Sequence, residues 1–389
     1  MITSNALWVC ALLPLLSAWG QERIWISAKI QDVPVKLILD TGAEDLIVFQ
    51  KTVDKLKLKI TMPAPKSPPP PNKVNFAITK KYPLEIWGNR SRVAFAVINN
   101  DPTDTEHIDG IVGWPYIRKT LIKVDAASAT AMPLHLSSEP GSEWRRFEIQ
   151  PKCDSLILRV PASGEARLAV AVDSGSPAGV RLPRAAWKQW KDLHERAPIT
   201  LKLYYQPGMG NILAEESWAD EIKIGCITLS NVPVMEGNVS DSTHDNVTIS
   251  ATLGVAALRH FELLLDGKHG FAYTRCKEGE MSRYEHNRLG ACFFRATQTN
   301  VFFVRVAEGT PAYTAGMRNG DLLLSISDSS GVSLKVDNRI FQESPAGTAF
   351  EFQLQRNDEK YKTWVSLRDI LGASVTNASS APSPKRVRH

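Results

Sequence analysis

Two short segments of the sequence combine an acid, a hydroxyl side chain and a glycine. Residues 40–42 are Asp-Thr-Gly and residues 173–175 are Asp-Ser-Gly, and each segment follows an apolar run, residues 35–39 and 168–172. Burial penalises a charged carboxylate, so an acid at the end of a buried strand is expected to be protonated or hydrogen-bonded. Two such acids brought together share one proton and hold a water molecule between them. That pair suits hydrolytic chemistry that needs neither a metal ion nor a covalent intermediate.

The residues that follow the acids suit this arrangement. The hydroxyls of Thr41 and Ser174 can hydrogen-bond across the pair and lock the two turns together. Gly42 and Gly175 allow a tight bend and let a substrate approach the backbone.

The two segments differ after the glycine, because Ser176 offers a hydroxyl where Ala43 offers none. Fewer hydrogen bonds to a carboxylate leave its ionised form less favoured. We therefore expect the acid pair to titrate higher than a pair with serine in both positions, and its activity to reach roughly pH 5–7.

Both segments belong to an internal repeat. The matched pieces are apolar strands (46–49 and 180–182), helices (51–58 and 183–193), hairpins (84–88 with 93–98, and 221–225 with 232–235) and apolar stretches ending in glycine (110–113 and 251–254). The repeat predicts two copies of one strand-rich module, residues 21–140 and 141–278. A pseudo-twofold arrangement of the copies would bring the two acids together.

With these features, residues 22–275 resemble the aspartic proteases of the retropepsin and pepsin type, in a two-lobed, single-chain bacterial form. The segment 40–45, Asp-Thr-Gly-Ala-Glu-Asp, is similar to the retropepsin motif. The resemblance implies a mainly β fold with two pseudo-symmetric acid-protease β-barrel lobes. It also implies that Asp40 and Asp173 are the catalytic acids, without a metal or other cofactor. Since one chain supplies both acids, a monomer is sufficient for the chemistry.

The sequence departs from that family in the segments that would cover a substrate. The first module has no glycine-rich flap between residues 58 and 84, and carries a proline-rich stretch at 63–72 instead. The second module keeps a candidate flap, with Tyr205, Gly208 and Gly210 as substrate-binding residues. We therefore expect an asymmetric clamp on a peptide or protein substrate.

Residues 286–370 resemble a PDZ domain of the kind attached to bacterial proteases. A strand at 301–306, a short helix, a Gly-Asp turn at 320–321 and a strand at 322–326 follow in the order of that fold. The resemblance implies a groove beside a helix at 338–342, with the C-terminal carboxylate of a peptide held by the backbone of Leu289, Gly290 and Ala291. A structural appendage with an unused groove is the alternative. Residues 371–389 are predicted to form a disordered tail.

The first 20 residues read as a signal peptide. Their apolar run, residues 6–18, is too short to span a bilayer. It ends in Ala18-Trp19-Gly20, a pattern that a signal peptidase could cut. A secreted or periplasmic protein is expected, with no membrane span after signal removal; a buried N-terminal strand or helix is the alternative. A net charge of +5 without a basic, aromatic stripe argues against nucleic acid as a partner.

Four cysteines remain after residue 20: Cys153, Cys226, Cys276 and Cys292. Their spacing fits no zinc pattern, and both disulfides and free thiols remain open. Taken together, the sequence predicts an exported aspartic endopeptidase. The alternative is a catalytically inactive protease fold that binds peptides. The sequence does not define which acid holds the proton at rest, which bonds are cut, or whether processing is required.

Overall fold

The computed structural model describes residues 23–65, 75–98, 108–134, 140–206, 210–237, 243–244, 247–277, 284–295 and 301–372. Of these residues, 50% lie in strands and 11% in helices, so the predicted mainly β fold is confirmed. The expected signal peptide, proline-rich residues 66–72, Gly208 and residues 373–389 of the expected tail lie outside the described part.

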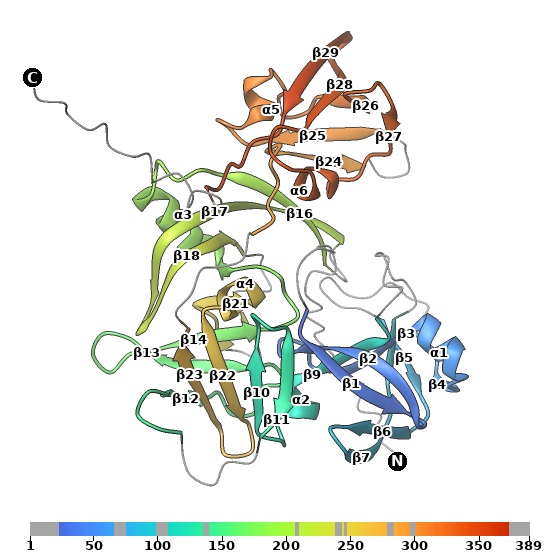
Figure 1. The fold of residues 1–389 in the computed structure, drawn as a ribbon, viewed down its shortest axis with the longest axis vertical. Helices are drawn as coiled ribbons and strands as arrows, with labels where there is room; N and C mark the ends of the chain where they lie inside the picture. The colour runs from blue at the N-terminus through green and yellow to red at the C-terminus, as the bar shows by residue number, and fades with distance from the viewer. Residues whose placement is uncertain are drawn as a thin grey trace, which may run out of the picture. The chain divides into compact units, whose positions relative to one another are not determined.

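The chain divides into two compact units (Figure 1). The N-terminal unit comprises the described residues of Met1–Ala197 and Lys202–Met281. The C-terminal unit comprises those of Ser282–His389 together with Pro198–Leu201; the strand Thr200–Gln206 therefore has its first two residues in this unit and the rest in the N-terminal unit. Among the described residues, no helix is long and apolar enough to cross a membrane.

The N-terminal unit is built on one extensive sheet and a separate two-stranded ribbon. The strands of its first half are β1 (Trp25–Ile30), β2 (Val33–Asp40), β3 (Leu46–Phe49), β4 (Ile60–Met62), β5 (Ala77–Thr79), β6 (Tyr82–Ile86), β7 (Asn89–Val93), β8 (Ala96–Ile98), β9 (Gly110–Gly113), β10 (Ile122–Asp125) and β11 (Thr130–Pro133). Those of its second half are β12 (Arg145–Ile149), β13 (Ile157–Pro161), β14 (Arg167–Asp173), β15 (Val180–Leu182), β16 (Thr200–Gln206), β17 (Gly210–Ile224), β18 (Ile227–Glu236), β19 (Thr243–His244), β20 (Val247–Thr248), β21 (Ala251–Gly254), β22 (Phe261–Asp266) and β23 (Phe271–Cys276). The helices of this unit are α1 (Gln50–Leu56), α2 (Trp114–Ile117), α3 (Arg184–Leu193) and α4 (Val255–Leu258).

Strand pairing repeats between the two halves. Strand β2 runs parallel to β9, and β14 runs parallel to β21. In turn, β3 is antiparallel to β9 and parallel to β8, while β15 is antiparallel to β21 and parallel to β18. A helix follows each equivalent strand, α1 after β3 and α3 after β15. The internal repeat seen in the sequence is therefore also a repeat of strand pairing.

A ladder between β10 and β22 joins the halves into one sheet. The two strands are antiparallel, with Ile122 opposite Leu265 and Val124 opposite Leu263. All four side chains are buried. The described strands do not close into a barrel in either half. The expectation of β-barrel lobes is therefore wrong in this respect.

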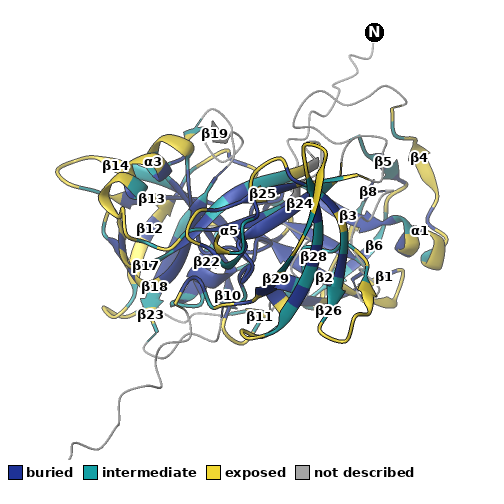
Figure 2. Cartoon of the chain, turned by 90° about the horizontal axis from the view of Figure 1, so that it is seen from above, coloured by how far each residue is buried: buried dark blue, intermediate teal, exposed yellow. Residues whose placement is uncertain are grey.

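The first-half hairpin differs from its predicted bounds. Its strands are β6 and β7, and the turn lies at Trp87 and Gly88, both with positive φ. The apolar run 93–98 is not one strand, because β8 separates from β7 and pairs with β3 in the interior. Buried residues gather in the strands, and exposed ones on α1, α3 and the turns (Figure 2).

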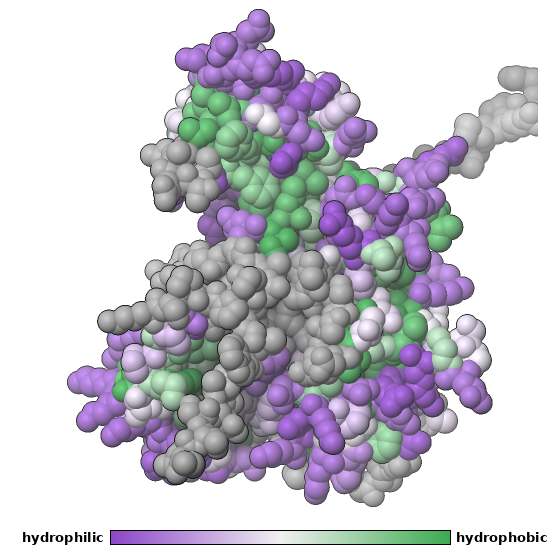
Figure 3. Space-filling view, turned by 180° about the vertical axis from the view of Figure 1, so that it is seen from behind, coloured by the Kyte–Doolittle hydropathy of each residue, from purple (hydrophilic) through white to green (hydrophobic). Residues whose placement is uncertain are grey.

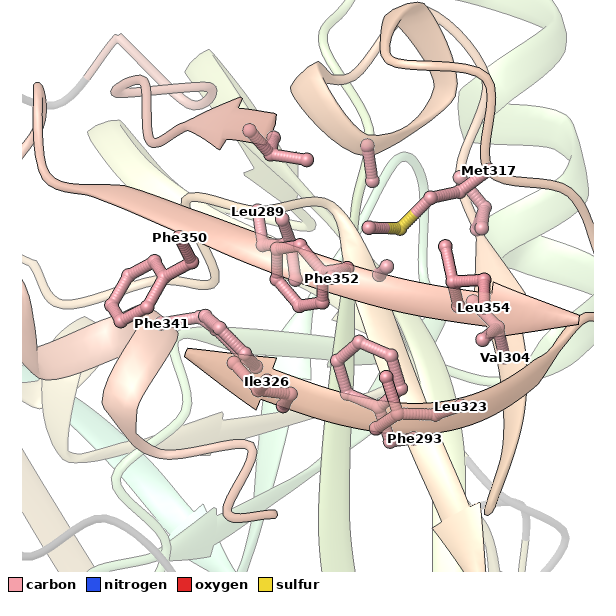
Figure 4. Packing of buried hydrophobic residues seen from close by; sticks show 14 of the residues in the cluster. Leu289, Phe293, Val304, Met317, Leu323, Ile326, Phe341, Phe350, Phe352 and Leu354 are labelled. Atoms are coloured by element: carbon pink, nitrogen blue, oxygen red, sulfur yellow. The ribbon is translucent and has the colours of Figure 1, made fainter. Parts of the chain in front are cut away.

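The C-terminal unit contains a second sheet. Its strands and helices are β24 (Ala291–Arg295), β25 (Phe302–Val306), α5 (Pro311–Thr314), β26 (Leu322–Asp328), β27 (Ser333–Leu334), α6 (Ile340–Glu343), β28 (Ala349–Arg356) and β29 (Glu359–Ser366). The strand order is β24-β25-β26-β28-β29, which leaves β24 at an edge. Stacked and tilted phenylalanines, among them Phe293, Phe341 and Phe352, form the centre of its core (Figure 4).

Apolar side chains also reach the surface of this unit, where Figure 3 shows exposed apolar area. The large ones are Val301, Phe303, Leu324, Val332 and Trp364.

Candidate active site

Asp40 and Asp173 occupy equivalent positions at the ends of two buried strands. Asp40 ends β2 and lies opposite Gly113 of β9. Asp173 ends β14 and lies opposite Gly254 of β21. Both carboxylic side chains are buried, at 1% and 3% exposure. The two acids predicted from the repeat are thus set into their strands in the same way.

The glycines opposite the acids are required by close packing. A Cβ on Gly113 would lie 2.5 Å from the carbonyl oxygen of Ala43, and one on Gly254 would lie 2.4 Å from that of Ala178. Neither gap admits a side chain, since real Cβ atoms do not come so close to a backbone oxygen. The apolar stretches that end in glycine therefore pack directly against the turns that follow the acids.

A reciprocal set of hydrogen bonds joins the two acid turns. The backbone N–H of Thr41 donates to Ser174 Oγ at 3.0 Å, and that of Ser174 donates to Thr41 Oγ1 at 3.1 Å. The same hydroxyls donate to carbonyl oxygens of the opposite half, Thr41 to Val172 at 2.7 Å and Ser174 to Leu39 at 2.9 Å. All of these groups are buried, so the expected lock between the turns is present.

Both carboxyl groups lie against Gly42. A Cβ placed on this glycine would be 3.0 Å from Asp173 Cγ and 3.4 Å from Asp40 Oδ1. The turns therefore converge, and Gly42 leaves the space that the two acids share.

Asp40 is buried, and hydrogen bonds reach one of its two carboxyl oxygens. Its Oδ1 accepts from the backbone N–H groups of Gly42 and Ala43, at 2.9 and 3.0 Å. Within the described part of the chain, no hydrogen-bond donor reaches its Oδ2. Burial and then the nearby charge of Asp173 raise the pKa of Asp40 well above its ordinary value, against the opposing effect of the two backbone donors and Arg23.

Asp173 differs from Asp40 by having a buried cation as a partner. Its Oδ1 accepts from the backbone N–H of Ser176 at 3.1 Å, and its Oδ2 accepts from Arg181 Nη2 at 2.7 Å. The side chains of this ion pair are only 6% and 5% exposed. Arg181 was not among the predicted site residues. The signal for it is a charge inside the buried strand Val180–Leu182, at the position that Ile47 occupies in the first half.

A second buried arginine lies near both acids. Arg23, just before β1, donates from Nη1 to the carbonyl oxygen of Gly175 at 2.6 Å. Burial lowers its pKa to about 10, although the charges of Asp40 and Asp173 act in the opposite direction. This contact has no local sequence signal, because the two residues are 152 positions apart.

The candidate flap residues are described only in part. Tyr205 lies in β16 and Gly210 is the first residue of β17, but the side chain of Tyr205 and the whole of Gly208 lie outside the described part. The flap therefore stays a prediction.

In the C-terminal unit, the loop predicted to bind a carboxylate donates its N–H groups internally. The backbone N–H groups of Leu289 and Gly290 both donate to Asn287 Oδ1, at 3.1 Å each. Ala291 belongs to β24 and pairs with Val306. All three predicted residues are buried, so a peptide carboxylate could reach these amides only by displacing the Asn287 side chain.

The edge of β24 is also engaged, by the side chain of Asn338. Its Oδ1 accepts from the backbone N–H of Phe293 at 2.8 Å, and its Nδ2 donates to the Phe293 carbonyl oxygen at 3.0 Å. Asn338 lies just before α6, within the segment predicted to be the groove helix.

Cys153, Cys226, Cys276 and Cys292 are free thiols, so no disulfide links them. No group of three or more metal-ligating side chains occurs among the described residues. No protein-family model matches the sequence, and no curated protein is significantly similar to it.

Proposed function

We propose that the protein is an aspartic-type endopeptidase with a lobe in each half, residues 21–140 and 141–278. The observation that carries this proposal is the convergence of two equivalent buried acids across the Thr41–Ser174 lock. Two carboxyl groups that face a common space, one of them with a strongly raised pKa, are suited to share a proton.

The proposed reaction uses both acids at once. The ionised carboxylate removes a proton from a water molecule as the water oxygen attacks the scissile carbonyl carbon. The protonated acid gives its proton to the carbonyl oxygen, which produces a neutral tetrahedral gem-diol. The acid that took the proton from water then protonates the amide nitrogen, while the other acid, now ionised, removes a proton from a gem-diol hydroxyl. The C–N bond breaks, amine and carboxylic acid are released, and one proton is left on the pair. The raised pKa of Asp40 lies in the direction expected for activity at roughly pH 5–7.

Cleavage of a peptide library by the purified protein, with and without a statine-type inhibitor, tests this function. Asp40→Asn should lower the cleavage rate by about 100-fold or more, since general acid–base groups contribute that much. Asp192→Asn, on the exposed face of α3, is the matched control and should cleave as the natural protein does. Unchanged cleavage by Asp40→Asn would remove Asp40 from the mechanism.

A peptide-binding protein without turnover is the second candidate. The specific observation that favours it is the Arg181–Asp173 ion pair, which together with the Ser176 N–H engages both carboxylate oxygens of one of the two acids. A protein that binds the statine-type inhibitor at every pH from about 4 to 8, yet releases no peptide fragments, would fit this alternative and not the enzyme.

We also propose that residues 286–370 form a PDZ domain that docks peptides, and that residues 1–20 direct export to the periplasm or the exterior. The order β24, β25, α5, β26, α6, β28 supports the first of these assignments. Adding a C-terminal peptide to the full chain tests it: binding should be lost when the peptide ends in an amide instead of a carboxylate. A structural appendage would bind neither peptide.

A further inference from the structure

Arg181 forms a buried ion pair with Asp173, one of the two acids. It belongs to β15, where its backbone pairs with Thr252 and Met235 in the interior of the sheet. Its guanidinium donates to Asp173 Oδ2 at 2.7 Å, and the residue is 5% exposed. A guanidinium held so far from water strongly favours an ionised partner.

Other charged groups near the acids do not create the same asymmetry. Arg23 acts on both carboxyl groups, so it favours ionisation of either one. The charges that act on Asp40 are those of Asp173 and Arg23. Asp40 Oδ1 accepts only weakly acidic backbone donors, from Gly42 and Ala43. Both acids accept backbone N–H groups, Asp40 from Gly42 and Ala43 and Asp173 from Ser176, but only Asp173 has the Arg181 guanidinium on its other oxygen.

We propose that Arg181 is a positioning residue that holds Asp173 as the carboxylate, so that Asp40 carries the shared proton. The inference builds on the proposed function and assigns the roles within it. Asp173 removes the proton from the water, and Asp40 donates its proton to the carbonyl oxygen of the substrate. Asp40 Oδ2, which no donor among the described residues reaches, is the oxygen from which this proton would be donated.

A titration of the natural protein tests the assignment without any catalytic assay. With aspartate side chains labelled by carbon-13, NMR spectra of the full chain are compared with those of Asp40→Asn and Asp173→Asn. The signal missing from Asp40→Asn should titrate at the higher pH, and the signal missing from Asp173→Asn should remain ionised at lower pH. The reverse order of the two signals would overturn the proposal.

Variants of Arg181 then test the cause through the pH–rate profile. In Arg181→Met, the acidic limb of kcat/KM should move up by roughly 1–3 pH units, the effect expected when an adjacent opposite charge is lost. Arg181→Lys keeps the charge and should restore most of the natural profile. Arg184→Met is the matched control, because this nearby arginine is 90% exposed and pairs with Glu236 instead. An unmoved acidic limb in Arg181→Met would contradict the role.

Failure of the proposed function and failure of the assignment of the proton to Asp40 give different results. A natural protein that cleaves nothing defeats the proposed function, whereas the NMR titration still decides which acid holds the proton. If Arg181→Met does not fold, the titration is repeated on Arg181→Lys, in which Asp173 should again be the acid that ionises first. Ionisation of Asp40 first in that variant would count against Arg181 as the group that assigns the roles.

Discussion

Thr41 and Ser174 are 133 positions apart in the sequence, and the side-chain oxygen of each accepts a hydrogen bond from the backbone N–H of the other. Each hydroxyl also donates to a carbonyl of the opposite half. The relationship is symmetric even though one residue is threonine and the other serine. It joins the two acid turns through buried hydrogen bonds.

Replacing Thr41 by valine should destabilise the protein. The change keeps the shape but removes the acceptor for the Ser174 N–H and the donor to Val172, leaving buried polar groups unsatisfied. We expect the free energy of unfolding to fall by about 2–4 kcal/mol, measured by denaturant unfolding. Thr61→Val removes an exposed hydroxyl that donates to Ile78, and should change stability by at most about 0.5 kcal/mol. Equal losses in the two variants would contradict the role of the lock.

Gly42→Ala should slow cleavage strongly while leaving the protein folded. The added Cβ would lie 3.0 Å from Asp173 Cγ and so force the two carboxyl groups apart. A displacement of this kind costs about 100-fold in rate. The control is Gly141→Ala, whose Cβ would meet only the end of the exposed Glu143 side chain. Full activity of Gly42→Ala would mean that the acids do not work from these positions.

Asp45→Asn should stabilise the protein at neutral pH. Burial and the charge of Asp154 raise the pKa of Asp45 to about 6. The unfolded chain therefore releases this proton at lower pH than the folded protein does. Stability linked to Asp45 is complete below pH 3.8 and is lost as the pH rises through about 6.

We expect Asp45→Asn to unfold at the same denaturant concentration as the natural protein at pH 3.5, and to be about 2–3 kcal/mol more stable at pH 7.5. The exposed Asp192→Asn should show no such divergence. A stability difference that is constant with pH would show that Asp45 is not the source.

The buried ion pair between Lys202 and Glu216 should show strong coupling. The two side chains are 5% and 1% exposed, with a separation of 3.0 Å. Lys202→Met leaves a buried carboxylate without this cation, and should reduce the free energy of unfolding by about 3–5 kcal/mol. The double variant with Glu216→Leu should recover most of the loss. In the exposed pair Lys223–Glu221, Lys223→Met should cost about 1 kcal/mol or less. Additive losses in the buried pair would refute the coupling.

Asn338→Ala should increase the affinity of the full chain for extended peptides that end in a carboxylate. The substitution frees the N–H and carbonyl of Phe293 on the edge of β24, which a peptide strand can then use. We expect about a tenfold lower Kd by isothermal titration calorimetry. Asn319→Ala, which removes an amide that contacts Val306 of β25, should leave affinity unchanged. Weaker binding by Asn338→Ala would instead show that peptides contact this amide.

The strands around the acids were predictable because local and repeated signals agree there. The apolar runs before Asp40 and Asp173, and the apolar stretches ending at Gly113 and Gly254, appear in the same order in both halves. Matching stretches of sequence form matching parallel pairs, with each acid opposite a glycine. Asn287 also carried a local signal, since an asparagine two residues before Leu289 favours a side-chain turn.

The charges around the acids could not be predicted in the same way. The first-half counterpart of Arg181 is the apolar Ile47, so the comparison of the two halves gives no partner for this charge. The partner of Arg23 lies 152 residues away, a contact that only the tertiary fold creates. The error in the hairpin has the same origin, because the pairing of Ala96 with Ile47 decides where β8 begins.

The ladder between β10 and β22 has a consequence for how the chain is made. During synthesis, Ile122 and Val124 emerge long before Leu263 and Leu265, so β10 has no partner on this edge until nearly the whole N-terminal unit has been translated. Pairing over such a sequence separation forms late and slowly. The nascent chain therefore carries an apolar strand edge that invites aggregation, and a chaperone that shields it would protect this protein during its biogenesis.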